Sequence, residues 1–350
     1  WDADEDDEVA YLPRPPQTIY WDGLRQVSDA GPKWDLQTML GILKKGACPI
    51  GIDLGYEFLK VAQLATNGEQ ITVVSCQWMR CAAYDPPDGP QWQRWAIDAI
   101  CHALANGRFR GKDVVVALPT TELFIEHLKC PQAAEGKFED AIFSKIRQKM
   151  PSGWTRNNTV IKCMPTEQDK ILVIAAERAI IDRHLAIYEG ARLTVKSMAV
   201  WPVAMATCYA RLFARPGTAF DSAVMLLDIR PEYTNMVVCR GRNLLLARSI
   251  PIGGRQLRGI AEIDTLTSEV SALRNRFLLL YGDVQIERLI FLSGPAIAPE
   301  VCRIVGADLS LRAQLGDCQV ALGMQTISDG PSRGDEVQTS WALAFGLSLS

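Results

Sequence analysis

The stretch Ile50-Gly51-Ile52-Asp53-Leu54-Gly55-Tyr56-Glu57-Phe58-Leu59-Lys60 predicts how the body of this chain folds. An apolar strand ends in Asp53 and Leu54, Gly55 allows a tight turn, and a second strand begins at Phe58. Asn67-Gly68 then leads into a third strand at 70–78, because Asn-Gly between alternating runs is typical of a hairpin. Three antiparallel strands are therefore expected before residue 80.

The second half of the chain repeats this pattern. Strands are predicted at 223–229, 234–239 and 244–250, and the first of them contains Asp228 near its end, as the earlier strand contains Asp53. The two halves thus form a repeat of supersecondary structure with low sequence identity. Further strands are predicted at 114–118 and 288–292, and helices at 92–104, 255–262, 268–281, 298–305 and 340–349, with another starting at 200–202.

Residues 119–195 are predicted to form a small α/β unit. Strands are expected at 123–128, 159–163 and 171–175, and helices at 137–150 and 177–188, the second ending at Gly190. Two helices packed on three strands are enough for a subdomain.

The first 40 residues differ from the rest of the chain in composition and charge. Residues 1–40 are predicted to be a flexible leader, rich in acids and proline, with a short helix at 36–43. Residues 1–8 hold six acids, so the net charge of −3 leaves 37 basic against 34 acidic residues, or +3, for the rest. A nearly neutral body argues against nucleic acid as a partner.

The composition indicates a globular chain of two or three domains. It has 350 residues, of which 48% are apolar, enough to form buried cores. The longest stretch without a charge, Ser197–Ala210, has 14 residues and contains Pro202. A membrane-spanning helix needs about 20 apolar residues.

The cysteines and histidines do not form a recognisable metal site or catalytic triad. The ten cysteines include no CxxC pair, and they are interpreted as small buried apolar residues in a reducing compartment. The three histidines, His102, His127 and His184, are interpreted as lying outside any metal-ligand or nucleophile pattern. Zinc chemistry and Ser/His/Asp catalysis are therefore not expected.

Three segments are candidates for contacts with a nucleotide. An Asp at a strand end can hold a metal ion, a Gly can bring backbone amides close to phosphate, and a Lys can point its ammonium at it. Taken alone, such residues also cap turns, lie on surfaces or bend helix starts. The candidate cofactor-binding residues are Asp53, Gly55, Lys60, Asp228, Gly253, Gly254, Ser293 and Gly294, with Asp53 and Asp228 as metal ligands and no catalytic residue assigned.

The order of these segments resembles the actin-like ATPase superfamily, and within it the family of the type IV pilus assembly protein PilM. The resemblance spans residues 40–350, and its most specific motifs lie at 51–55, 250–257, 292–294 and 344–347. It implies an α/β, actin-like (ribonuclease H-like) fold of two lobes, with ATP and Mg²⁺ as ligands. The first lobe would comprise 41–118 and 196–215, the second lobe 218–350, and an inserted subdomain of the FtsA and PilM type 119–195.

Four departures from the family's pattern predict a degenerate nucleotide site. Tyr56 and Glu57 stand where a small hydroxyl residue would face phosphate, and a carboxylate there adds repulsion. Arg230 and Pro295 replace glycines, which removes a close backbone approach and an N–H donor. Trp201 replaces the Glu or Gln that would orient the attacking water, and indole has no acceptor. ATP binding is therefore expected to be weakened or lost, and turnover absent.

The resemblance implies a cytoplasmic scaffold of a type IV pilus or related secretion machine, associated with an inner-membrane complex through its partner. The expected partner is a short cytoplasmic peptide of a PilN-like inner-membrane protein, bound in a groove within residues 50–195, besides other subunits of the machine. The main alternative is an active, polymerising, FtsA-like ATPase. A sugar or acetate kinase and a GspL-like cytoplasmic domain are weaker alternatives.

Overall fold

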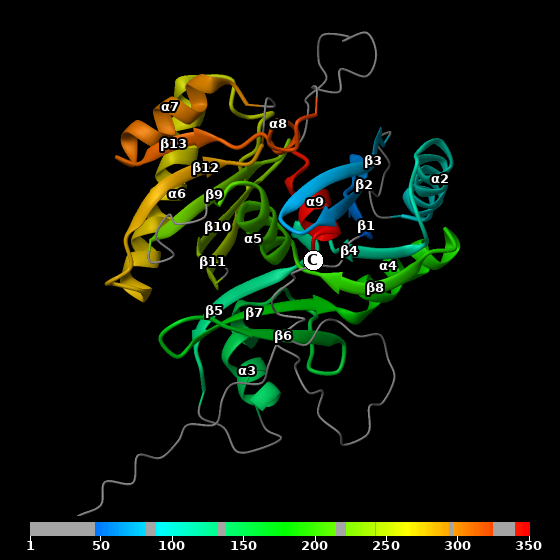
Figure 1. Ribbon diagram of the computed structural model, residues 1–350. Helices are drawn as coiled ribbons and strands as arrows, with labels where there is room; N and C mark the ends of the chain where they lie inside the picture. The colour runs from blue at the N-terminus through cyan, green and yellow to red at the C-terminus, as the bar shows by residue number, and fades with distance from the viewer. Residues whose placement is uncertain are drawn as a thin grey trace, which may run out of the picture.

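The computed structural model describes residues 46–81, 89–131, 138–214, 222–241, 243–293, 297–324 and 340–350. Two five-stranded sheets form separate lobes, and a three-stranded sheet lies below them in the view of Figure 1. The predicted leader, residues 1–40, and the predicted helix at 36–43 lie outside these ranges.

The first sheet has the strand order β3-β2-β1-β4-β8. Strands β1, β2 and β3 are antiparallel, as predicted, while β4 and β8 run parallel to β1. The bounds are β1 Gly46–Leu54, β2 Phe58–Asn67, β3 Gln70–Arg80, β4 Asp113–Ala117 and β8 Thr194–Ala199.

The second sheet has the same topology, with the order β11-β10-β9-β12-β13. Three antiparallel strands are again followed by two parallel ones, which confirms the predicted repeat. Strand β9 corresponds to β1, so Asp228 and Asp53 occupy equivalent ends of the two sheets. The bounds are β9 Ala223–Ile229, β10 Thr234–Arg240, β11 Asn243–Ile250, β12 Ile286–Phe291 and β13 Arg312–Leu315.

Two helices, α5 (Trp201–Leu212) and α9 (Ala342–Ser348), fill the space between the two sheets. Helix α9 packs on β1 and β2, and α5 packs on α9, β10 and β11. The hydroxyl of Ser348 accepts a hydrogen bond from the Leu64 amide (3.0 Å) and donates to the Pro49 carbonyl (2.8 Å). The last helix in the sequence is thus anchored to the first strands of the body.

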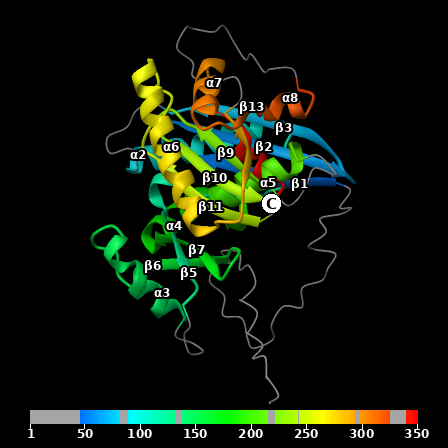
Figure 2. The same ribbon diagram turned by 90° about the vertical axis from the view of Figure 1, so that its left-hand side faces the viewer.

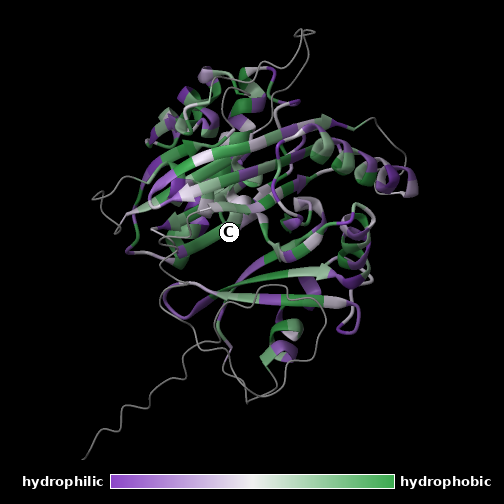
Figure 3. Cartoon of the chain, turned by 45° about the vertical axis from the view of Figure 1, so that its right-hand side comes forward, coloured by the Kyte–Doolittle hydropathy of each residue, from purple (hydrophilic) through white to green (hydrophobic). Residues whose placement is uncertain are grey.

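The outer faces of the sheets are covered by amphipathic helices. Helices α2 (Pro90–Asn106) and α4 (Arg178–Gly190) pack on the first sheet, and α6 (Ile260–Leu280) and α7 (Pro299–Asp308) on the second. Figure 2 shows α6 and α7 side by side on one face. Figure 3 shows mostly apolar strands and outer helices that alternate apolar and polar residues. Each sheet with its outer helices is called a lobe below.

The small subdomain is an antiparallel sheet, β5-β7-β6, covered by α3. Its bounds are β5 Phe124–Lys129, β6 Thr159–Pro165, β7 Lys170–Glu177 and α3 Phe138–Ile146. The expectation that two helices pack on this sheet holds only for α3. Ile187 and Tyr188 of α4 are buried in the core of the first lobe, because the apolar face of α4 fits against α2.

The two helices predicted at 255–262 and 268–281 form one helix, α6, and residues 255–259 precede it. The run of hydroxyl residues between them does not interrupt the helix. Thr267 and Ser268 donate to the carbonyls of Ile263 and Asp264, at 2.8 and 2.9 Å, one turn earlier. The polar run is therefore satisfied inside the helix.

Among the described residues, the sequence pattern missed four elements: β8, β13, the 3-10 turn η1 (Thr120–Glu122) and the single-turn helix α8 (Cys318–Ala321). All four residues of β13 are exposed at the edge of its sheet, so its sequence shows no alternation.

The ten cysteines are free thiols. Among the described helices, none combines the length and the apolarity needed to cross a membrane.

Candidate functional site

The predicted metal ligands lie at the contact between the two lobes. Asp53 at the end of β1 and Asp228 at the end of β9 come from different sheets. Arg230 lies between them and donates from Nη2 to Asp53 Oδ2 and from Nε to Asp228 Oδ2, both at 2.8 Å. The residue that replaces a glycine of the family pattern therefore binds both carboxylates.

This ion-pair cluster is buried. Asp228 is fully buried, and Asp53 and Arg230 are each 8% exposed. Burial by itself would lower the pKa of Arg230, but the charges of Asp228 and Asp53 outweigh burial and raise that pKa well above its usual value. The arginine is thus charged at neutral pH.

Lys60 is also buried, and not a surface residue. It pairs across β1 and β2 with Asp53, and its ammonium donates to the carbonyl oxygen of Ser340, just before α9. Burial, followed by the charge of Arg230, lowers the pKa of Lys60 to about 7. The side-chain nitrogen of Lys60 therefore bonds to the protein's own backbone, at Ser340, and is not exposed to solvent.

The amide of Gly55 is used in the hairpin turn. It donates to the carbonyl of Phe58 at 2.9 Å. The hydroxyl of Ser293, a residue that is 1% exposed, accepts from the Ile229 amide at 2.6 Å and so supports the strand end that carries Asp228. Gly294 and Pro295 lie outside the described residues.

The prediction that Gly253 and Gly254 open a helix with unprotected amides is wrong. The Gly254 amide donates to the carbonyl of Arg230 at 2.8 Å, and the Gly253 amide to the side chain of Gln256 at 2.7 Å. A Cβ at Gly253 would lie 2.4 Å from the Pro231 carbonyl oxygen. Gly253 lets this loop pack closely against the backbone of Pro231 and Glu232, and the amides of both glycines are used as donors within the protein.

Mg²⁺ and ATP do not fit this arrangement. A metal ion between Asp53 and Asp228 would have to displace the Arg230 guanidinium, and the amides of Gly55, Gly253 and Gly254 already donate to the protein. Trp201, at the expected water-orienting position, is fully buried in the core between the lobes. In the described ranges, no three His, Cys, Asp or Glu side chains are grouped as a metal site.

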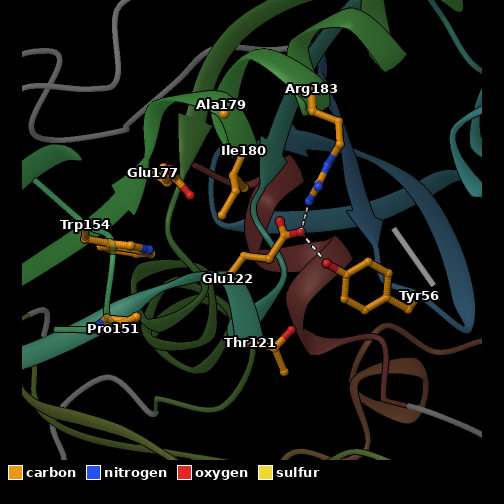
Figure 4. Close-up of a pocket in the computed structure, with 9 residues that line it drawn as sticks. All are labelled: Tyr56, Thr121, Glu122, Pro151, Trp154, Glu177, Ala179, Ile180 and Arg183. Atoms are coloured by element: carbon orange, nitrogen blue, oxygen red, sulfur yellow. Dashed lines mark hydrogen bonds and ion pairs between the residues drawn. The ribbon is translucent and has the colours of Figure 1, made fainter. Parts of the chain in front are cut away.

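A second site lies where the first lobe meets the small subdomain (Figure 4). Glu122 forms its floor and is 8% exposed. Tyr56 and Arg183 both donate to Glu122 Oε1, and His184 Nε2 lies 2.8 Å from Oε2. Tyr56, one of the departures from the phosphate motif, thus serves this second site.

The pocket above Glu122 has a volume of about 420 Å³. Figure 4 shows Trp154 and Pro151 on one side, Ile180 in the middle and the carboxylate of Glu177 nearby. Asn158 Nδ2 donates to Glu177 Oε1 at 3.1 Å. The pocket therefore combines an apolar wall with carboxylate acceptors.

The strand that follows Glu122 joins the subdomain to the second lobe. Glu126 of β5 accepts from Arg248 of β11 (2.9 Å) and Arg276 of α6 (2.6 Å). His127 Nε2 accepts from the amide of Ala247, on edge strand β11, at 3.3 Å. Burial, together with Arg248, lowers the pKa of His127 to about 3, so this ring is neutral and able to accept.

Because His127 must be neutral in the folded protein, acid is expected to weaken the fold. Between pH 6.5 and about 3 the unfolded chain binds a proton that folded His127 refuses, so unfolding becomes easier as the pH falls. The slope from this group approaches ~1.4 kcal/mol per pH unit. Urea unfolding of wild type and His127→Gln between pH 7 and pH 4.5 measures it.

The glutamine variant is the matched control, since its side-chain oxygen can still accept from Ala247. The stability difference between wild type and variant should shrink or reverse as the pH falls. A difference that stays constant over this range would mean that His127 is not buried in its neutral form.

A sequence model of the family described as type IV pilus assembly protein PilM matches residues 51–269, more than half of the chain. The chain belongs to this family. None of the curated proteins matches the sequence.

A solved structure of the same family shows the same fold as this PilM family member. The PilM–PilN type IV pilus biogenesis complex matches with a TM-score of 0.65 and 19% identity, covering 86% of this chain and 97% of that one. The ethanolamine utilization protein EutJ from Carboxydothermus hydrogenoformans matches at 0.47 and 11%, covering 88% and 90%. A Bacteroides thetaiotaomicron protein with an actin-like ATPase fold matches at 0.46 and 8%, covering 79% and 95%. The predicted actin-like α/β fold is confirmed.

The resemblance implied a groove within residues 50–195, but the sequence did not identify the residues of this second site. Glu122 and its donor Tyr56 are 66 residues apart, and Arg183 follows 61 residues after Glu122. No short motif joins residues at such distances, so only the packing of the subdomain on the first lobe brings them together.

Proposed function

We propose that this PilM family member is a scaffold of a type IV pilus machine that binds a peptide of a PilN-like partner in the pocket above Glu122. Membership of the family and the pocket between first lobe and subdomain support this proposal. In the similar solved complex, PilM is bound to PilN. The partner would hold the protein at the cytoplasmic face of the inner membrane.

The chemistry of the pocket fits an extended peptide. Trp154, Pro151 and Ile180 offer apolar surface to a side chain, and Glu177 offers a carboxylate acceptor to N–H donors. Glu122 is held rigidly by its donors, so little entropy is lost when a ligand is bound. An aromatic anchor in a preformed pocket is where binding energy concentrates.

We further propose that this function proceeds without ATP hydrolysis. The carboxylates that would hold a metal ion bind Arg230, and Trp201 offers no acceptor to a water molecule. A scaffold needs a stable surface for its partner and no chemical step. These observations favour a scaffold with a degenerate nucleotide site over an active, polymerising ATPase.

Substitution of Trp154 tests the peptide site. Fluorescence anisotropy with the labelled cytoplasmic peptide of the PilN-like protein from the same organism should show at least tenfold weaker binding for Trp154→Ala. The control is Trp78→Ala, because Trp78 is also partly buried but lies on edge strand β3, outside the pocket. Equal losses in both variants, or undiminished binding by Trp154→Ala, would contradict the assignment of this pocket.

A further inference from the structure

Arg230 lies where the sequence predicts a divalent cation. Its guanidinium presents two different N–H edges, Nε to Asp228 and Nη2 to Asp53, each at 2.8 Å. One carboxylate belongs to each lobe, so the arginine carries the same bridge between lobes that a shared metal ion would carry.

The two carboxylates require a cation if the lobes are to stay together. Both are buried, and two buried carboxylates in one cluster repel each other unless a positive charge lies between them. A bound metal ion supplies this charge only while it is bound. A side chain supplies it permanently, whatever the concentration of metal or nucleotide.

The backbone around Arg230 holds it in this position. Its amide donates to the Tyr233 carbonyl and its carbonyl accepts from Gly254, both at 2.8 Å. At the surface of the same contact, Arg255 of the second lobe pairs with Glu57 of the first and, at 2.9 Å, with Glu232. The buried bridge is therefore continued by a weaker, solvent-exposed one.

We propose that Arg230 is a tethered substitute for the metal ion, which holds the two lobes in one closed arrangement without nucleotide. This inference goes beyond the scaffold function and does not depend on the identity of a partner. Asp228 Oδ1 is buried and accepts no hydrogen bond within the described part of the chain. Removal of the arginine would thus leave two carboxylates that a divalent cation can bind, because the ammonium of nearby Lys60 donates to the Ser340 carbonyl.

Titration of the full-length chain with Mn²⁺, followed by electron paramagnetic resonance, tests the substitution. Arg230→Gly, which restores the glycine of the family pattern, should bind Mn²⁺ at least tenfold more tightly than wild type. The added change Asp228→Asn should abolish the gain. A folded Arg230→Gly protein that binds Mn²⁺ no better than wild type would overturn the proposal. It would also be overturned if wild type itself bound Mn²⁺ and the Asp53→Ala variant lost that binding.

A second variant keeps the test decisive if Arg230→Gly fails to fold. Asp53→Ala removes the bridge between the lobes but leaves the pair of Arg230 with Asp228. Hydrogen–deuterium exchange in loops 54–58 and 229–234 should be at least tenfold faster in this variant, and millimolar Mg²⁺ and ATP should not change it in wild type. Unchanged exchange in Asp53→Ala, or protection of wild type by Mg²⁺ and ATP, would refute the closed arrangement.

The matched control for exchange is Asp113→Ala. Asp113 pairs with Lys196 at 3.3 Å on the surface of the first lobe, and both side chains are 54% exposed. Its loss should leave both loops unchanged. Equal acceleration by this control would show a general loosening of the fold and would count against the bridge.

Discussion

Gly346→Ala is expected to destabilise the protein by ~3 kcal/mol or more. A Cβ at this position in α9 would lie 1.9 Å from the carbonyl oxygen of Ala204 in α5. Helix α9 has no room to retreat, because on its other side Gly51 of β1 is equally close: a Cβ there would lie 2.1 Å from the Ala344 carbonyl oxygen. Both contacts are with backbone, so no side-chain rotation relieves them.

Urea unfolding followed by circular dichroism measures this effect. The control is Gly254→Ala, where the nearest atom to an added Cβ is 3.8 Å away and the backbone conformation is ordinary. It should change stability by less than ~1 kcal/mol. If Gly346→Ala proves as stable as this control, the close packing of α9 between α5 and β1 is incorrect.

Trp201→Gln is expected to cost ~3–5 kcal/mol of stability and to produce no ATP turnover. Trp201 is fully buried in the core that joins the two sheets, α5 and α9. Glutamine would leave a cavity and bury an amide among apolar side chains. The family pattern implies a polar side chain here to orient water, but the predicted metal ligands, Asp53 and Asp228, already bind Arg230.

Two measurements on the same preparation check this expectation: urea unfolding, and phosphate release with Mg²⁺ and ATP. Trp201→Phe is the control, because it keeps an apolar aromatic ring, leaves a smaller cavity and removes an indole N–H that has no hydrogen-bond partner among the described residues. It should cost less than half as much as the glutamine. Turnover gained by Trp201→Gln would show that the site still binds nucleotide productively.

The close packing at Gly51 and Gly346 explains part of the motif that links the chain to its family. The opening Gly51 and the closing Gly346 allow the terminal helix to pack against the first strand and α5. Neither glycine contributes to a phosphate site in this structure. Such motifs therefore report the fold of the chain more directly than its ligand.

Local sequence pattern was sufficient to predict a helix or strand wherever residues close in sequence determine that element. The alternation and the Asn67-Gly68 turn predicted the hairpin of β2 and β3, and the periodic apolar residues after Pro90 predicted α2. Edge strand β13 has all its residues exposed and gave no such signal. The division of 255–281 into two helices was wrong because hydroxyl side chains bond within α6.

The sequence by itself determined two similar halves, an inserted α/β unit and a nucleotide motif with departures at Tyr56, Trp201 and Arg230. Only the tertiary structure decided what these departures do. Arg230 binds Asp53, 177 residues away, and Tyr56 binds Glu122 at another site. The reason is physical: propensities and periodicity act over a few residues, whereas the partner of a buried charge depends on which distant elements pack together.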